Sequence, residues 1–77
     1  MDIKKKFALT INYLRLTQNE KVTQQMIADA VGITVRHYYD LEKGNKQPTL
    51  SVLEGLASFY NLKLSKFMQM VEEREGE

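Results

Sequence analysis

The chain has 77 residues, a net charge of +1 and no cysteine. A chain of this length forms one domain with a modest core, because folding buries only about 60% of the surface that the unfolded chain exposes. Without cysteine, neither a disulfide nor a cysteine zinc site can add stability, so packing must provide it. The apolar runs are short and the basic start lacks a signal-peptide core, so we expect a soluble, cytoplasmic protein with no membrane span.

Charge is divided unevenly along the chain. Residues 1–46 hold eight Lys and Arg against five Asp and Glu, whereas residues 47–77 hold three against five. The difference is small, so the count alone fits ordinary solvated faces as well as it fits a surface for a polyanion. It indicates only that a binding site is to be sought in the first half.

A first helix is predicted over residues 3–17. Its core face is formed by apolar residues at helical spacing, Ile3, Phe7, Ile11 and Leu14. The consecutive lysines 4–6 fan around the helix axis, which favours solvation over phosphate contact for them. The polar segment 17–22 is predicted to be a loop.

Two short helices joined by a tight turn follow. Thr23 can cap the second helix, and Gly32 stands where a helix end needs a left-handed residue, with Ile33 as the apolar contact of that cap. Thr34 then offers a new N-cap, so a third helix is predicted over residues 35–43, ending at Gly44. The inward residues are predicted to be Ile27, Ala30 and Val31 in the second helix, and Tyr38 and Leu41 in the third.

The other face of the third helix suggests DNA recognition. It would carry Val35, Arg36, Tyr39, Asp40 and Lys43, a mixture that a merely solvated helix seldom has. An arginine can bond O6 and N7 of guanine, and a valine can pack on a thymine methyl group. For Tyr39, DNA contact is favoured modestly over an ordinary surface position.

Two residues of this helix are harder to place. Asp40 would repel phosphate, and three roles stay open for it: accepting from a cytosine amino group, bonding Arg36, or facing water. His37 is the single histidine, and without cysteine or a carboxylate pair at ligand spacing a phosphate contact or a surface position is favoured over a metal role.

Residues beside the third helix could hold the DNA backbone. Gln24 combines a side-chain amide with a helix N-terminus, which suits a phosphate. After Gly44 come Asn45, Lys46 and Gln47, three polar side chains in a loop that could rest on the sugar-phosphate backbone.

The last part of the chain is predicted to form two more helices. Thr49 can cap the fourth, Gly55 could allow a close helix contact, and Asn61 with Leu62 can end it. The predicted inner residues are Leu53, Leu56, Ala57 and Tyr60 in the fourth helix, and Leu64, Phe67, Met68 and Val71 in the fifth.

The fifth helix carries more apolar side chains than a lone terminal helix requires. Phe67, Met70 and Val71 slightly favour a homodimer seam there over simple packing on the first helix. Glutamates are unfavourable at a helix C-terminus, so the domain is placed at residues 1–72, and residues 73–77 are expected to be a frayed acidic tail.

Four segments together resemble the Cro/repressor-type (XRE-like) helix-turn-helix family. They are T-Q-x-x-I-A-x-x-V-G-I-T at 23–34, L-E-K-G at 41–44, Pro48-Thr49, and Y-N-L-K-L at 60–64. The resemblance covers roughly residues 5–70. It implies an all-α, five-helix lambda-repressor-like domain that binds double-stranded DNA with the helix 35–43 in the major groove.

The resemblance also implies roles for single residues. Val35, Arg36 and Tyr39 match positions that face bases. Thr34, Lys43 and Asn45 match positions that contact the backbone. Gln24 matches a glutamine that contacts phosphate and often the recognition side chains. Lys46 is added to the backbone contacts from its place in the polar loop. Glu42 matches a glutamate that usually pairs with an arginine of the first helix. The usual spacing gives Thr17 instead, so Arg15 takes that role if the loop is two residues longer.

The expected function is therefore sequence-specific DNA binding by a transcriptional regulator, most often a repressor, on a palindromic operator. No catalytic set and no glycine-rich phosphate loop is present, so we expect no enzyme, and no cofactor, metal or small-molecule ligand. The alternative is a protein-interaction module, or an antitoxin-like partner binder, that keeps the same fold.

Overall fold

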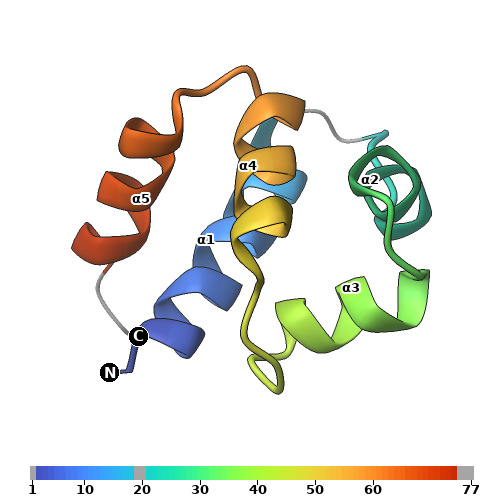
Figure 1. Ribbon diagram of the computed structural model, residues 1–77, viewed down its shortest axis with the longest axis horizontal. Coiled ribbons are helices and arrows are strands. Elements are labelled where there is room, and N and C mark those ends of the chain that lie inside the picture. The colour runs from blue at the N-terminus through green and yellow to red at the C-terminus, as the bar shows by residue number, and fades with distance from the viewer. Residues whose placement is uncertain (1, 19–20, 75–77) are drawn as a thin grey trace.

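The computed structural model describes residues 2–18 and 21–74, which form five helices and no strand (Figure 1). The helices are α1 (Ile3–Gln18), α2 (Gln24–Val31), α3 (Val35–Glu42), α4 (Leu50–Phe59) and α5 (Leu64–Glu73). The all-α class and the five predicted helices are confirmed. In the part of the chain described, no helix has the length and apolar character needed to cross a bilayer.

The helix boundaries differ from the predicted ones by a residue or so. α1 continues to Gln18 and α3 ends at Glu42, with Lys43 as its C-cap. Of the segment 73–77 expected to fray, Glu73 lies in α5 and Arg74 is its C-cap, with its N–H donating to Val71 O. Residues 75–77 lie outside the described residues, as do residues 19–20 of the predicted loop.

Three threonines start three of the helices. Thr23 Oγ1 accepts the backbone N–H of Met26 at 3.1 Å, Thr34 Oγ1 that of His37 at 3.0 Å, and Thr49 Oγ1 that of Val52 at 3.2 Å. Each bond satisfies an N–H that has no partner within its helix, and losing such a cap typically costs about 1 kcal/mol. All three predicted caps are confirmed.

Left-handed residues end two helices as predicted. Gly32 has φ 87°, and the N–H groups of Gly32 and Ile33 both donate to Ala28 O, at 2.8 and 3.0 Å. Asn61 has φ 58° after α4, and Leu62 N–H donates to Ala57 O at 2.8 Å. Because Gly32 turns the chain within one residue, α3 begins almost immediately after α2.

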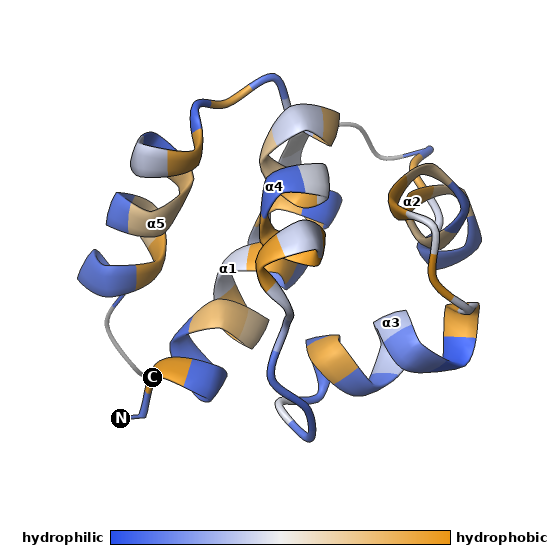
Figure 2. Ribbon diagram, in the orientation of Figure 1, coloured by the Kyte–Doolittle hydropathy of each residue, from blue (hydrophilic) through white to orange (hydrophobic). Residues whose placement is uncertain are grey.

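The core lies where the apolar faces of the five helices meet (Figure 2). α2 packs on α3 and α4, α1 packs on α3 and α5, and α4 also contacts α5. The rings of Phe7 and Phe67 meet edge to face, with centroids 6.2 Å apart, and join α1 to α5. Gly55 permits a close approach of α4 to α2, because a Cβ there would lie 3.1 Å from Val31 Cγ1.

Two residues predicted to face inward do not. Ile3 is 50% exposed, because it stands in the first turn of α1 at the rim of the core. Ala30 is exposed, whereas Ala28 is fully buried. Ala28 and Ala30 flank the line of Ile27 and Val31 on opposite sides, and helical spacing alone does not say which flank a neighbouring helix covers.

The apolar surplus of α5 is used within the domain. Phe67 and Val71 are fully buried, and Met70 is half-buried against the core. Packing on α1, the alternative to a dimer seam, therefore accounts for the residues that had favoured the seam.

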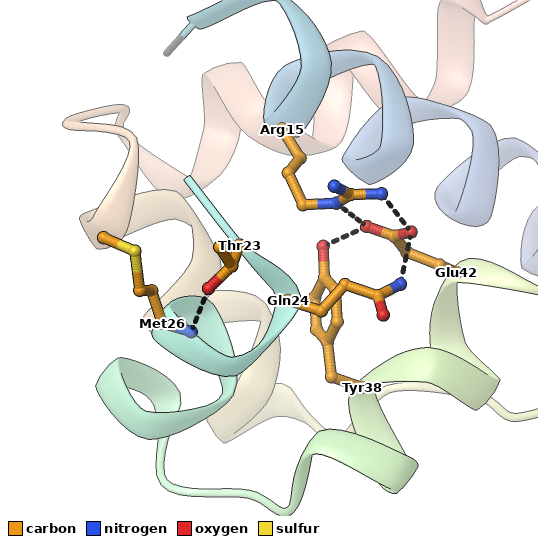
Figure 3. A network of polar contacts seen from close by, with 6 residues as sticks. All are labelled: Arg15, Thr23, Gln24, Met26, Tyr38 and Glu42. Atoms are coloured by element: carbon orange, nitrogen blue, oxygen red, sulfur yellow. Dashed lines mark hydrogen bonds and ion pairs between the residues drawn. The ribbon is translucent and has the colours of Figure 1, made fainter. Parts of the chain in front are cut away.

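A buried carboxylate joins the first three helices (Figure 3). Glu42 is held by Arg15, which donates through Nε to Oε2 at 2.7 Å and through Nη2 to Oε1 at 3.1 Å. Tyr38 Oη donates to Oε2 at 2.6 Å, and Gln24 Nε2 donates to Oε1 at 3.0 Å. The pairing of Arg15 with Glu42 is thus present, and Arg15 takes the role that the usual spacing would have given to Thr17.

These hydrogen bonds decide the charge of Glu42. Burial raises the pKa of its carboxyl group, but the bonds from Arg15, Tyr38 and Gln24 outweigh burial and leave that pKa below its usual value. Burial, together with the hydrogen bond to Glu42, raises the pKa of Tyr38 well above its normal range. Burial and the charge of Glu42 also raise the pKa of Tyr60, at the end of α4, to about 12. Glu42 is therefore ionised at neutral pH, and both tyrosines are neutral.

The Gly32→Ala variant tests the turn between α2 and α3. No atom would obstruct the added methyl group, so the cost comes from the left-handed backbone at φ 87°, which an L side chain adopts at a penalty of about 1–2 kcal/mol. We expect urea denaturation to show that the free energy of unfolding falls by that amount. Gly32→Asn is the matched control and should lose less, because asparagine tolerates this conformation better. Equal stability of the alanine variant and the unaltered protein would contradict this account.

The Glu42→Gln variant tests the buried carboxylate. Because the pKa of Glu42 is lower in the folded state, its contribution is fully present above the unfolded pKa, about 4.3, and is lost as pH falls through the folded value. At pH 7 the variant should lose about 2 kcal/mol of unfolding free energy, since Arg15 keeps partial solvent access and the amide can still accept.

The two proteins should also differ in their response to acid. Measured by urea denaturation between pH 7 and pH 3, the stability gap between unaltered protein and Glu42→Gln should narrow below about pH 4. A stability gap that stays constant across this range would show that ionisation of Glu42 does not make the stability depend on pH.

Candidate nucleic-acid interface

One side of α3 is built into the core and the other faces outward. Tyr38 and Leu41 are fully buried, as predicted, while Val35 is 38% and Tyr39 39% exposed. Arg36 is more open still, with 81% of its side chain exposed. In Figure 1, α3 lies at the edge of the molecule, below α2 and α4, so this outward side is open to a large ligand.

Four of the predicted contact residues come together from two helices. Gln24, at the start of α2, and Val35, Arg36 and Tyr39 of α3 line one open hollow of about 330 Å³. An amide, a guanidinium, a branched apolar side chain and an aromatic ring thus share one surface. Such a set can meet the polar edge of a base pair and a thymine methyl group together.

The side chain of Gln24 is held in place by a hydrogen bond on its inward side. Its Nε2 donates to Glu42 Oε1 at 3.0 Å, which fixes the amide beside the hollow and leaves the side chain half-buried. The family resemblance implied contacts of Gln24 with phosphate and with the recognition side chains, but the inward bond to Glu42 was not predicted. A glutamine and a glutamate 18 positions apart give no local signal of contact.

Two positive charges lie close to the ring of Tyr39. The guanidinium of Arg36 lies 5.6 Å from the centroid of this ring and the ammonium of Lys43 lies 5.3 Å from it. Cations at these distances are attracted by the electrons of the ring, worth roughly 0.5–1 kcal/mol at an exposed site. The ring therefore keeps both cations on the outward side of α3.

Asp40 pairs within the protein. Its Oδ1 lies 3.6 Å from Arg36 Nε and its Oδ2 lies 3.8 Å from Lys46 Nζ, with 13% of the side chain exposed. Of the three roles left open for Asp40, the pairing with Arg36 is present, as a long ion pair. The contact with Lys46 was not foreseen, since it depends on the loop folding back after α3. Both pairs are long and open to solvent on the cation side, so each is weak enough to be exchanged for another anion.

The remaining predicted backbone contacts border this surface. Thr34 is exposed and starts α3, and its oxygen accepts from His37 while its hydroxyl can donate outward. Lys43, Asn45 and Lys46 are exposed after α3. Asn45 N–H donates to Asp40 O at 3.0 Å, which ties the loop to the helix. All eight predicted contact residues thus lie in or beside α3 and the start of α2.

Comparison with known proteins identifies the same kind of domain. The family model described as helix-turn-helix matches residues 11–67. No curated protein sequence matches the chain. A crystal structure of the clp gene regulator ClgR from Corynebacterium glutamicum is 14% identical, with a TM-score of 0.82 over 94% of this chain and 74% of that one. A second ClgR crystal structure is 13% identical, with a TM-score of 0.82 over 99% and 96%.

At such low identity the ClgR structures show a shared fold only. The family model spans well over half of the chain, and it includes the turn at Gly32, all of α3 and the loop behind it. This protein therefore belongs to the Cro/XRE-type helix-turn-helix family of DNA-binding transcription regulators.

Proposed function

We propose that this protein binds specific double-stranded DNA sequences with α3 in the major groove and represses transcription there. The observation that carries the proposal is the two-sided character of α3. Tyr38, Leu41 and Glu42 fix the helix to the domain, while Val35, Arg36 and Tyr39 share the outward hollow with Gln24. A surface with this composition suits the major groove, where an arginine can donate to guanine and an apolar side chain can pack on a thymine methyl group.

Arg36 and Val35 are the residues that we assign to sequence reading. Both stand in the first turn of α3, the part of a recognition helix that usually contacts base edges. Arg36 would donate to O6 and N7 of a guanine, exchanging its weak pair with Asp40 for a neutral, bidentate acceptor pair. Val35 would pack on a thymine methyl group, and Tyr39 would hold the guanidinium in place.

Backbone contacts are assigned to both sides of α3. Gln24 and the N-terminus of α2 offer donors to one phosphate, and Thr34 offers its hydroxyl to another. Lys43, Asn45 and Lys46 offer charge and an amide after the end of the helix. These contacts would set the depth and register of α3 in the groove without reading sequence.

A two-fold dimer on a palindromic operator belongs to the same proposal. Few cations stand on the outward side of α3, and Asp40 offsets part of their charge, so one domain should bind weakly. Two copies would place their recognition helices about 34–36 Å apart, one helical turn of DNA. A domain bound in this way in the cytoplasm would block transcription by occupying the promoter, which requires no further contact.

A protein-interaction module is the second candidate, favoured by one observation. Leu9, Tyr13 and Leu16 are 36%, 47% and 62% exposed and follow helical spacing on the outer side of α1. DNA binding should weaken steeply up to about 200 mM salt, since it releases counterions, whereas association through this apolar stripe should be nearly insensitive to salt. Selecting sites from random DNA, followed by binding at several salt concentrations, separates the two candidates.

Arg36→Ala tests base reading. On the selected site, we expect affinity to fall by about 1–3 kcal/mol, with preference relaxed at one base pair per half-site and retained elsewhere. Binding measured against a panel of single-base variants gives both quantities. An equal loss on every sequence would instead make Arg36 a backbone contact.

Lys46→Ala tests backbone contact after α3. We expect weaker binding to all sequences alike and a plot of log affinity against log salt that is shallower by roughly 0.9 for each lysine lost from a site. Lys66→Ala, at an exposed position of α5, removes the same charge away from the proposed surface and should leave the slope nearly unchanged. Equal effects of the two variants would argue against a local contact by Lys46.

A further inference from the structure

The three consecutive lysines at the start of α1 point to different neighbours. Lys6 Nζ donates a hydrogen bond to Glu72 O at 3.1 Å, so it satisfies a carbonyl group in the last turn of α5. Lys4 lines a small hollow of about 220 Å³ together with Gln47 and Pro48, at the end of the loop between α3 and α4. The fan that a helix imposes on consecutive residues thus sends Lys4 toward that loop and Lys6 away from it.

Lys5 lies against the loop itself. A Cβ added to Gly44, with φ 78°, would stand 3.9 Å from Lys5 Cγ and 3.8 Å from Ala8 Cβ. The aliphatic stem of Lys5 therefore runs beside the backbone of Gly44, between Lys43 and Asn45. Lys5 is exposed, so its ammonium group can reach solvent beside the loop.

The start of α1 thus brings Lys5 beside a loop that carries Lys43 and Lys46, and these three lysines are hereafter called the α1–loop cluster. Two carboxylates stand near it. Asp40 is paired with Arg36 and Lys46, and Asp2 Oδ1 accepts the backbone N–H of Lys5 at 2.9 Å. The positive charge of the three lysines exceeds the negative charge that Asp40 and Asp2 provide beside them. This excess favours binding of a further anion at the cluster.

We propose that Lys5 is a phosphate ligand, and that α1 extends the DNA contact of the α3–α4 loop by one phosphate. The inference rests on the proposed function and adds a helix to it that lies outside the helix-turn-helix motif. Lys5 is far from α3 in sequence, but its stem would lie within van der Waals contact of a methyl group added to Gly44, so it stands beside the loop expected to follow the sugar-phosphate backbone. As a point charge on a flexible stem, it can meet a phosphate without reading a base.

Lys5→Gln tests the proposal, with Lys66→Gln as the matched charge control and Lys46→Ala as the reference backbone variant. The affinity of each 77-residue protein is measured on the selected site and on an unrelated duplex at several salt concentrations. We expect Lys5→Gln to weaken both complexes, roughly three- to tenfold near 0.1 M salt for each lysine lost, and to lower the salt slope by about 0.9 for each lysine lost from the site. Lys66→Gln should change the slope little.

A neutral methylphosphonate linkage, moved one position at a time along the selected site, locates the phosphate. At one position the neutral linkage should weaken binding of the unaltered protein but not of Lys5→Gln, and this position should neighbour the one insensitive in Lys46→Ala. Urea denaturation of Lys5→Gln should match the unaltered protein, which excludes loss of folding as the cause.

Three results would overturn the proposal. If Lys5→Gln keeps the full salt slope while Lys46→Ala loses part of it, the proposed function stands and the Lys5 contact does not. If every methylphosphonate position affects Lys5→Gln as it affects the unaltered protein, Lys5 touches no phosphate. If the unaltered protein binds no duplex at any salt concentration, the proposed function and this extension of it both fail.

Discussion

The carboxylate of Glu42 is the contact on which the geometry of the domain depends. It stands at the end of α3, with 5% of its side chain exposed, and receives hydrogen bonds from Arg15 of α1, Gln24 of α2 and Tyr38 of α3 itself. Apolar burial is non-directional, whereas a carboxylate with several directed donors fixes the orientation of the groups that bond it. The angle of α3 relative to α1 and α2 is therefore defined by polar geometry within an otherwise apolar core.

This arrangement connects stability with the outward surface. The residue that α2 contributes to the buried network, Gln24, also lines the hollow with Val35, Arg36 and Tyr39. A side chain held by a buried acceptor loses little further freedom when a ligand arrives, so its contribution to binding is not offset by ordering. Arg36 is restrained less, because 81% of its side chain is exposed and its contacts with Tyr39 and Asp40 are weak.

Local chemistry made much of the fold predictable, whereas most contacts that depend on tertiary packing escaped prediction. The pairing of Arg15 with Glu42 is the exception, because the family resemblance implied it. Thr23, Thr34, Gly32 and Asn61 bond or bend within a few residues of themselves, so their types indicate caps and turns directly. Ala28 and Ala30 could not be told apart, because the choice depends on which flank another helix covers. The contact of Asp40 with Lys46, the bond of Gln24 to Glu42 and the approach of Lys5 to Gly44 depend on how whole segments pack, which no spacing encodes. The predicted contact residues lie together, but their DNA partners stay a prediction.

The division of α3 into two faces has an evolutionary consequence. Tyr38, Leu41 and Glu42 hold the helix to the domain, and none of them belongs to the set Val35, Arg36 and Tyr39 that faces outward. Substitutions in the outward set leave the buried contacts intact, and exposed changes of this kind typically alter stability by less than about 0.5 kcal/mol. Such a helix can drift from one target sequence to another while the fold stays under constant selection. The scaffold is therefore a natural starting point for grafting new recognition residues onto an unchanged core.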